Sequence, residues 1–124
     1  MLIKQTYIRV QMKMQNNTTT KLIKMTKNEI IRSIQAELNE LDLSKCPYSM
    51  KQLQSLQRSE PLSLWRHLFI AKMLCDLHSF NYVGNKFNRT HSTAQASLRE
   101  VYKALNGKNE KLYSVIELCQ PSTH

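Results

Sequence analysis

The chain has 124 residues, of which only two are glycine and three are proline. Gly84 and Gly107 are too far apart for the phosphate-binding loop of Walker-type enzymes or for the glycine-rich dinucleotide fingerprint, so the sequence excludes both. So few turn-forming residues also argue against an all-β sandwich or barrel. The composition favours an all-α fold, a helical bundle.

Lysine and arginine number 18 against 9 aspartate and glutamate residues, which gives a formal net charge of +9. Such an excess attracts nucleic acid or an anionic membrane surface. The charge is uneven: residues 1–24 carry five basic residues and no acidic one, residues 25–60 carry five of each, and residues 61–108 carry seven basic and two acidic residues. Two basic blocks therefore flank a neutral one.

Residue types that build metal, disulfide or membrane sites are few and scattered. The three cysteines are an odd number without a CxxC pair, and the four histidines include no HExxH motif. We therefore expect no disulfide framework, no metal site and no cofactor. No apolar run reaches the roughly 18 residues of a membrane-spanning helix, and the N-terminus lacks a signal-peptide core. These features predict a cytoplasmic protein without a membrane partner.

Residues 1–24 show a strand-like alternation of apolar and polar residues over positions 7–14, followed by a polar run. A lone strand would have nothing to pair with. We therefore interpret residues 1–24 as a flexible basic tail. The true start could be Met1, Met14 or Met25, since all three precede the first clear helix.

Thr26 and Glu29 form a capping-box pattern that predicts the start of a helix. Apolar residues then recur on one face of this 27–41 helix, namely Ile30, Ile31, Ile34, Leu38 and Leu41. This face either docks on the rest of the chain or forms a homodimer seam through Ile30, Ile34, Leu38 and Leu41. We assign residues 25–60 to an N-terminal helical extension.

Two further helices are predicted before residue 78. Ser49 is expected to cap a helix with one apolar side made of Met50, Leu53 and Leu56. Pro61 ends that helix or begins the next. The apolar stretch from Leu62 to Leu77 predicts a buried central helix, which is too short and too charged to cross a membrane.

Residues 79–106 predict a helix-turn-helix. Ser79 is expected to cap a short helix whose inner face is Phe80, Val83 and Phe87, and a second helix is expected to start at or beside Thr90. Apolar spacing gives the second helix an inner face of Ala94, Leu98, Val101 and Leu105, and Gly107 is expected to end it. We assign residues 61–120 to a DNA-binding domain.

The outer face of this second helix carries the candidate DNA-binding residues. Recognition helices present their N-terminal residues to base edges, and the positive end of the helix dipole favours a phosphate there. The alternative interpretation is a solvated helix cap. The candidates are Lys86, Arg89, Thr90, His91, Ser92, Thr93, Gln95, Arg99 and Lys103.

The segment Val83-Gly84-Asn85-Lys86-Phe87-Asn88-Arg89-Thr90-His91-Ser92-Thr93 resembles the helix-turn-helix signature of DnaA-type replication initiators, within the TrpR-like superfamily. The resemblance is specific over residues 83–101 and extends loosely over 66–118. It implies double-stranded DNA binding through the helix that begins at residues 91–93, in origin binding, replication initiation or transcription regulation. It also implies a bacterial or phage-like, nucleoid-associated protein.

The sequence departs from that family at several positions. Thr90 stands where the family usually has aspartate, so the family's target sequence does not carry over, and Gln95 could pair with adenine instead. The family's basic loop has no clear counterpart, with Arg58 and Arg66 as the only candidates. The family's ATPase module has no counterpart in this sequence either.

Two alternatives remain beside DNA binding. One is a helical interaction or dimerisation protein that uses the 27–41 amphipathic helix. The other is an enzyme, which we do not expect, because no Cys-His or Ser-His-Asp set is suggested by spacing. Asp76 and Glu100 alone do not make an acid-base pair.

Overall fold

The computed structural model describes residues 25–121, and all regular structure within them is helical. The prediction of an all-α helical bundle is therefore confirmed. The alternating pattern at positions 7–14 and the predicted tail lie outside the described residues. The helices are α3 (Lys27–Asn39), α4 (Met50–Leu53), α5 (Leu62–Cys75), α6 (Phe80–Lys86), α7 (His91–Leu105) and α8 (Glu110–Leu118), with a 3-10 turn at Leu43–Lys45.

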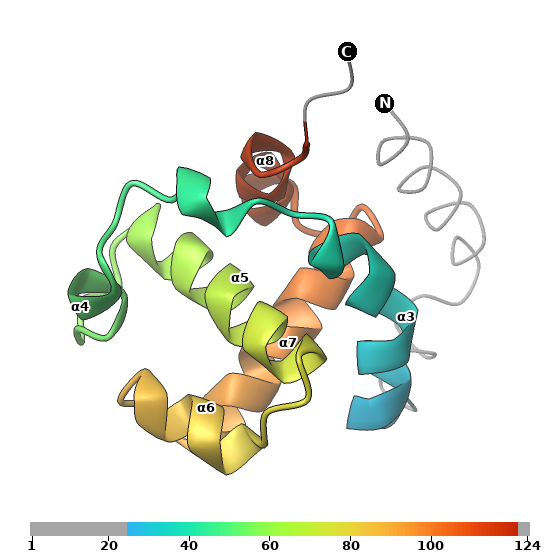
Figure 1. The fold of residues 1–124 in the computed structure, drawn as a ribbon, viewed down its shortest axis with the longest axis horizontal. Coiled ribbons are helices and arrows are strands. Elements are labelled where there is room, and N and C mark those ends of the chain that lie inside the picture. The colour runs from blue at the N-terminus through green and yellow to red at the C-terminus, as the bar shows by residue number, and fades with distance from the viewer. Residues whose placement is uncertain (1–24, 122–124) are drawn as a thin grey trace.

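Helices α5 and α7 cross at the centre of the molecule (Figure 1). Helix α3 packs against both of them, α6 packs mainly on α7, and α8 packs on the ends of both central helices. The linker after α3 is tied to the C-terminal end of α8, because the Asp42 amide donates a 2.8 Å hydrogen bond to the Cys119 carbonyl. One core therefore joins the N-terminal extension to the helices that follow it.

Helix α3 begins with the expected capping box between Thr26 and Glu29. Its apolar face is buried within the chain, with Ile30 and Leu38 fully covered and Ile34 and Leu41 nearly so. Of the two alternatives for this face, the structure therefore shows docking on the rest of the chain. The alternative, a homodimer seam through this face, is not supported, because side chains already packed against α5 and α7 have no surface left for a second copy.

Helix α4 is capped by Ser49 as predicted, through a capping box with Gln52. The helix is only four residues long, so the predicted apolar side is wrong in part. Leu53 is buried, whereas Met50 is 38% exposed and Leu56 lies 76% exposed in the loop that follows. The helix ends at Leu53, so Leu56 no longer follows the helical spacing that the prediction assumed.

Helix α5 has few polar interruptions because it is covered on several sides, and Trp65, Leu68 and Leu74 lie in the core. The predicted extension to Leu77 is wrong. The helix ends at Cys75, and Leu77 adopts a left-handed backbone with φ 72° and is 80% exposed. The chain must reverse there to begin α6, and this reversal turns the Leu77 side chain to solvent.

The last three helices follow the predicted pattern closely. Ser79 caps α6, Thr90 caps α7, and Gly107 follows α7 with a positive φ of 80°. The predicted inner face of α7 is buried along its whole length, at Ala94, Leu98, Val101 and Leu105. On α6, Val83 and the following Phe87 are fully buried, and Phe80 is half-buried. None of the described helices combines the length and apolar character needed to cross a bilayer.

Candidate nucleic-acid interface

The turn between α6 and α7 is fixed by two backbone features. Asn88 has a φ of 54°, and the Arg89 and Asn88 amides donate to the carbonyls of Gly84 and Asn85, which closes the end of α6. Asparagine tolerates this left-handed conformation better than most residues. At Gly84, a methyl group would lie 2.8 Å from the Arg89 carbonyl oxygen and 3.1 Å from that of Thr90. Glycine therefore allows the start of α7 to approach α6 closely.

Helix α7 begins at a polar cap. The Thr90 hydroxyl accepts a 3.1 Å hydrogen bond from the Thr93 amide and lies 3.1 Å from the Thr93 hydroxyl. The first-turn residues His91 and Ser92 are exposed, and the first turn contains no acidic residue. This end of the helix therefore presents hydroxyl groups, an imidazole and the positive end of the helix dipole to solvent.

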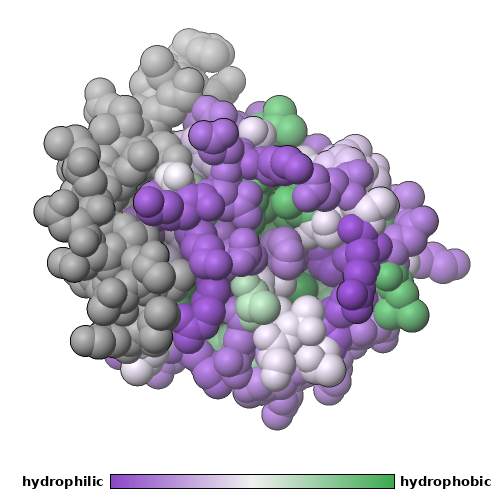
Figure 2. Space-filling view, turned by 180° about the vertical axis from the view of Figure 1, so that it is seen from behind, coloured by the Kyte–Doolittle hydropathy of each residue, from purple (hydrophilic) through white to green (hydrophobic). Residues whose placement is uncertain are grey.

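The side of α7 that faces away from the core carries a strip formed by Ser92, Ala96, Arg99 and Lys103. These four residues recur at the three- and four-residue spacing that places side chains on one helix face. We call them the outer strip. Ser92 and Ala96 are exposed, and the two basic residues are half-exposed. Figure 2 shows the molecule from the side on which α7 lies, and hydrophilic residues cover most of the described surface there.

His91 sits at one edge of the outer strip and joins three helices. Its Nδ1 atom lies 3.2 Å from Oδ1 of Asn81 on α6, and its Nε2 atom lies 3.3 Å from Nζ of Lys27 on α3. Gln95 also hydrogen-bonds the same ring through its side-chain amide. The predicted groove-facing Gln95 is thus half-buried beside His91. Docking of α3 brings Lys27, which the sequence did not suggest, to the candidate interface.

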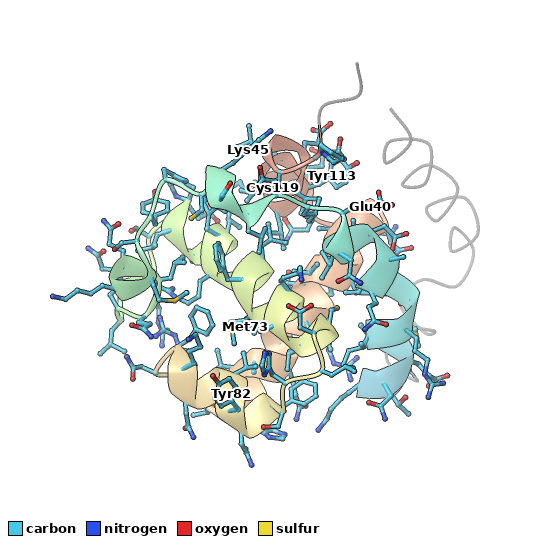
Figure 3. All side chains as sticks on the ribbon, viewed as in Figure 1. Glu40, Lys45, Met73, Tyr82, Tyr113 and Cys119 are labelled. Carbon is cyan, nitrogen blue, oxygen red and sulfur yellow. The ribbon has the colours of Figure 1, made fainter. Side chains whose placement is uncertain are left out.

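An aromatic edge continues from His91 along α6. The Phe80 and His91 rings are 5.6 Å apart at their centroids, and Lys27 Nζ lies 4.9 Å from the centre of the Phe80 ring. The neighbouring His78 stacks on Tyr82, which lies on the outer side of α6 (Figure 3). The contacts among Phe80, His91 and Lys27 join the first turn of α7 to the start of α6 and the start of α3.

Arg89 is placed differently from the other predicted contacts. Its guanidinium donates hydrogen bonds to the carbonyls of Phe87, at 3.0 Å, and Ser55, at 2.8 Å. The side chain is therefore directed toward the loop that follows α4, rather than along the outer strip. Lys86 is half-buried at the end of α6, where its backbone carbonyl accepts a hydrogen bond from the side-chain amide of Gln54.

Arg66 of α5 reaches the same loop from the other side. It is 5% exposed and donates hydrogen bonds to the carbonyls of Leu53, at 2.6 Å, and Ser55, at 3.2 Å. Arg66 and Arg89 thus share the Ser55 carbonyl as an acceptor. Burial, followed by repulsion from Arg89, lowers the pKa of Arg66, and burial followed by repulsion from Arg58 lowers that of Arg89.

A hollow lies between this loop and the start of α7. Its larger part has a volume of about 560 Å³ and an adjoining part about 310 Å³, and both are lined by Arg58, Arg89 and Thr93. We call this the arginine hollow. Nothing in the sequence indicated that these arginines would meet, because they come from three separate segments. The full lining is Leu56, Arg58, Ser63, Arg66, His67, Asn85, Asn88, Arg89, Thr90, Thr93 and Ser97.

His67 lines the floor of the smaller part of the hollow, where its Nδ1 atom lies 2.7 Å from the hydroxyl of the buried Ser97. Burial lowers the pKa of the His67 imidazole below its ordinary value of 6.5, Arg66 adds to the decrease, and Glu100 opposes it. The His67 ring tethers α5 to α7 through this contact.

Groups suited to metal or thiol chemistry do not gather in the part of the chain that the structure describes. No three His, Cys, Asp or Glu side chains in residues 25–121 come close enough to hold an ion. Burial raises the pKa of the Cys75 thiol to about 12 and that of Cys119 to about 11. Both thiols therefore stay protonated at neutral pH and act as small apolar groups.

Comparison with known protein families, curated proteins and solved structures gives no match for this chain.

Proposed function

We propose that this protein binds double-stranded DNA through α7, as a non-enzymatic reader of DNA sequence in replication control or transcription regulation. The observation that carries the proposal is the exposed start of α7. A polar first turn, held at a close glycine contact with α6, continues into a basic strip on the face opposite the core. An α-helix presented in this way fits the width of the DNA major groove.

The two faces of α7 support this proposal. Its inner face is committed to packing, and its outer strip is not. Small residues at Ser92 and Ala96 would let the helix backbone approach base edges, and Arg99 and Lys103 would lie nearer the sugar-phosphate backbone. The only acidic residue of α7, Glu100, is engaged by Lys103 at 3.2 Å and by Asn109 at 3.0 Å, so it is partly neutralised.

The resemblance of residues 83–101 to DnaA-type initiators adds to the proposal and defines its limits. Of the residues that the resemblance assigns to DNA, Thr90, His91, Ser92 and Thr93 lie at the start of α7, whereas the Arg89 guanidinium is bonded to main-chain carbonyls. We therefore assign Arg89 to supporting the turn, and Ser92 and Arg99 to the nearest DNA contacts.

Fluorescence anisotropy of a labelled mixed-sequence duplex at low salt tests the proposal. If about five phosphates are neutralised, the logarithm of affinity should fall with the logarithm of salt concentration with a slope of about −4 to −5. Ser92→Glu should weaken binding at least tenfold, because it places a bulkier, negatively charged side chain in a groove whose potential is itself negative. Arg99→Ala should weaken binding and reduce the slope by about 1.

Lys45→Ala is the matched control, because it removes one exposed positive charge at the end of the molecule opposite Tyr82 and α6 (Figure 3). It should leave affinity within about twofold of the parent. Circular dichroism should show the same melting temperature for all these variants. If Lys45→Ala weakens binding as much as Arg99→Ala does, the attraction is a general effect of net charge and α7 is not the reader.

Selection of bound duplexes from a random pool tests the sequence-reading part of the proposal. A recovered motif would show direct readout, and Thr90 predicts that the base preference given by an aspartate is absent at that position. Recovery of no motif would reduce the proposal to non-specific binding.

A further inference from the structure

The arginine hollow is distinct from the outer strip of α7, and its charge is unbalanced. Three guanidinium groups line it, from Arg58, Arg66 and Arg89, and none of its lining residues is acidic. The acidic residue on the same loop, Glu60, lies 3.5 Å from Lys111 of α8 instead. Three like charges around one space repel one another. Burial is the main cause of the lowered pKa of Arg66 and of Arg89, and repulsion from a neighbouring arginine adds to it in both cases.

Two of these arginines are anchored, so the hollow keeps its form without a ligand. Arg66 uses two of its five N–H groups on the Leu53 and Ser55 carbonyls. Arg89 bonds the carbonyls of Phe87, Asn88 and Ser55. Rigid arginines lose little conformational entropy when an anion arrives, which favours binding.

Arg58 differs from the other two. It is exposed, lines both parts of the hollow, and has no hydrogen-bond or ion-pair partner among residues 25–121. Hydroxyl groups of Thr90, Thr93 and Ser63 complete the polar wall, and the positive end of the α7 dipole lies beside them. Guanidinium, hydroxyl and helix dipole are the groups that bind phosphate oxygens.

We propose that the arginine hollow binds a phosphate group, held between Arg58, Arg89 and the hydroxyls at the start of α7. The larger part of the hollow, about 560 Å³, exceeds what one phosphate fills, so it has room for the remainder of a small phosphorylated molecule, with Leu56 as an apolar contact at its edge. A backbone phosphate of bound DNA is the second source of the same chemical group.

Calorimetric titration of the full chain with sodium pyrophosphate at low ionic strength tests the proposal without any DNA. The expected result is saturable binding of one pyrophosphate per chain that sodium chloride at equal ionic strength does not displace. Arg58→Ala should weaken binding about tenfold, and Arg58→Glu should abolish it. Lys45→Ala removes the same charge elsewhere and should bind as the parent does.

Arg58 is suited to this test because it contributes no bond within the described fold and repels Arg89, so both variants should melt at or above the temperature of the parent. Pyrophosphate should raise the melting temperature of the parent and of Lys45→Ala, but not that of Arg58→Glu. Absence of saturable binding, or equal binding by Arg58→Glu and the parent, would overturn the proposal.

A second arm identifies the source of the phosphate. If pyrophosphate binds equally well to protein already saturated with duplex, the site serves a free phosphorylated ligand. If duplex displaces pyrophosphate, and Arg58→Ala weakens both to the same extent, a DNA phosphate occupies the hollow. Either result supports a phosphate site, and a protein that binds pyrophosphate but no duplex would separate this site from the proposed function of α7.

Discussion

Two positively charged regions flank the first turns of α7, and they are built differently. On the outer strip, Arg99 and Lys103 project from a helix face that the core does not use. In the arginine hollow, Arg66 and Arg89 are held by main-chain carbonyls of the loop after α4. The basic residues of 61–108 are therefore held in two ways: Arg66 and Arg89 bond the main chain of a loop, whereas Lys103 pairs with Glu100 on the surface of α7.

The largest expected difference between the two regions is in stability. Arg66→Ala should lower the free energy of unfolding by about 2–3 kcal/mol, because it removes two charge-assisted hydrogen bonds and leaves the buried Leu53 carbonyl without its partner. The Ser55 carbonyl keeps its hydrogen bond from Arg89. Arg99→Ala, on the outer strip, should change it by less than about 0.5 kcal/mol. Urea unfolding followed by circular dichroism measures both. Equal losses would mean that the two regions are not distinct.

The contact that positions both regions is the approach of α6 to α7 at Gly84. Gly84→Ala places a methyl group against backbone oxygens, which cannot move aside as a side chain would, so it should cost about 1–3 kcal/mol. The neighbouring exposed Asn85→Ala is the control and should be neutral or slightly stabilising. Thermal melting would compare them, and an unchanged melting temperature for Gly84→Ala would contradict the close packing.

Much of this architecture could be predicted from the sequence, because it depends on local signals. The caps at Thr26, Ser79 and Thr90 and the buried spacing of α7 each involve residues within a few positions of one another. Such features follow from hydrogen bonds and periodicity within one helix.

The arginine hollow could not be predicted, because it depends on contacts between distant segments. The Ser55 carbonyl meets Arg66 and Arg89, which are 11 and 34 residues away in sequence. Residues 49–56 also looked like one longer apolar helix, whereas the chain turns after Leu53 and supplies carbonyls to both arginines. Spacing along a helix does not reveal where a loop will expose its backbone.

A smaller effect concerns pH and the floor of the hollow. The pKa of His67 is lowered by burial, so the unfolded chain binds the proton more tightly than the folded chain does. Stability should therefore fall as the pH decreases below about 6.5, and His67→Gln should remove that dependence. The pKa values of Glu29 and Asp42 are also lowered, so these carboxylates lose their contribution to stability only at more acidic pH, below their ordinary pKa values of 4.5 and 3.8.

Urea unfolding at a series of pH values from 7.5 to about 5 would measure this dependence. His78→Gln, in the exposed connection between α5 and α6, is the matched control and should keep the dependence of the parent. If His67→Gln and the parent lose stability in parallel, the His67 contact with Ser97 is not responsible.

The smallest expected effect concerns Lys103, which belongs to the outer strip and pairs with Glu100 at 3.2 Å. An exposed pair of this kind contributes at most about 0.5 kcal/mol, so Lys103→Ala should barely change the melting temperature. Lys103→Ala should still reduce the slope of the logarithm of affinity against the logarithm of salt concentration by about 1, because one phosphate contact is lost. A clear loss of stability with an unchanged slope would assign Lys103 to the fold and not to the interface.

The most direct measurement compares the binding of the parent, Ser92→Glu and Lys45→Ala to one mixed-sequence duplex at low salt by fluorescence anisotropy. DNA binding through α7 predicts that Ser92→Glu weakens affinity at least tenfold while its melting temperature and the affinity of Lys45→Ala stay unchanged. Equal affinity for Ser92→Glu and the parent, or no binding by the parent to any duplex, would contradict it.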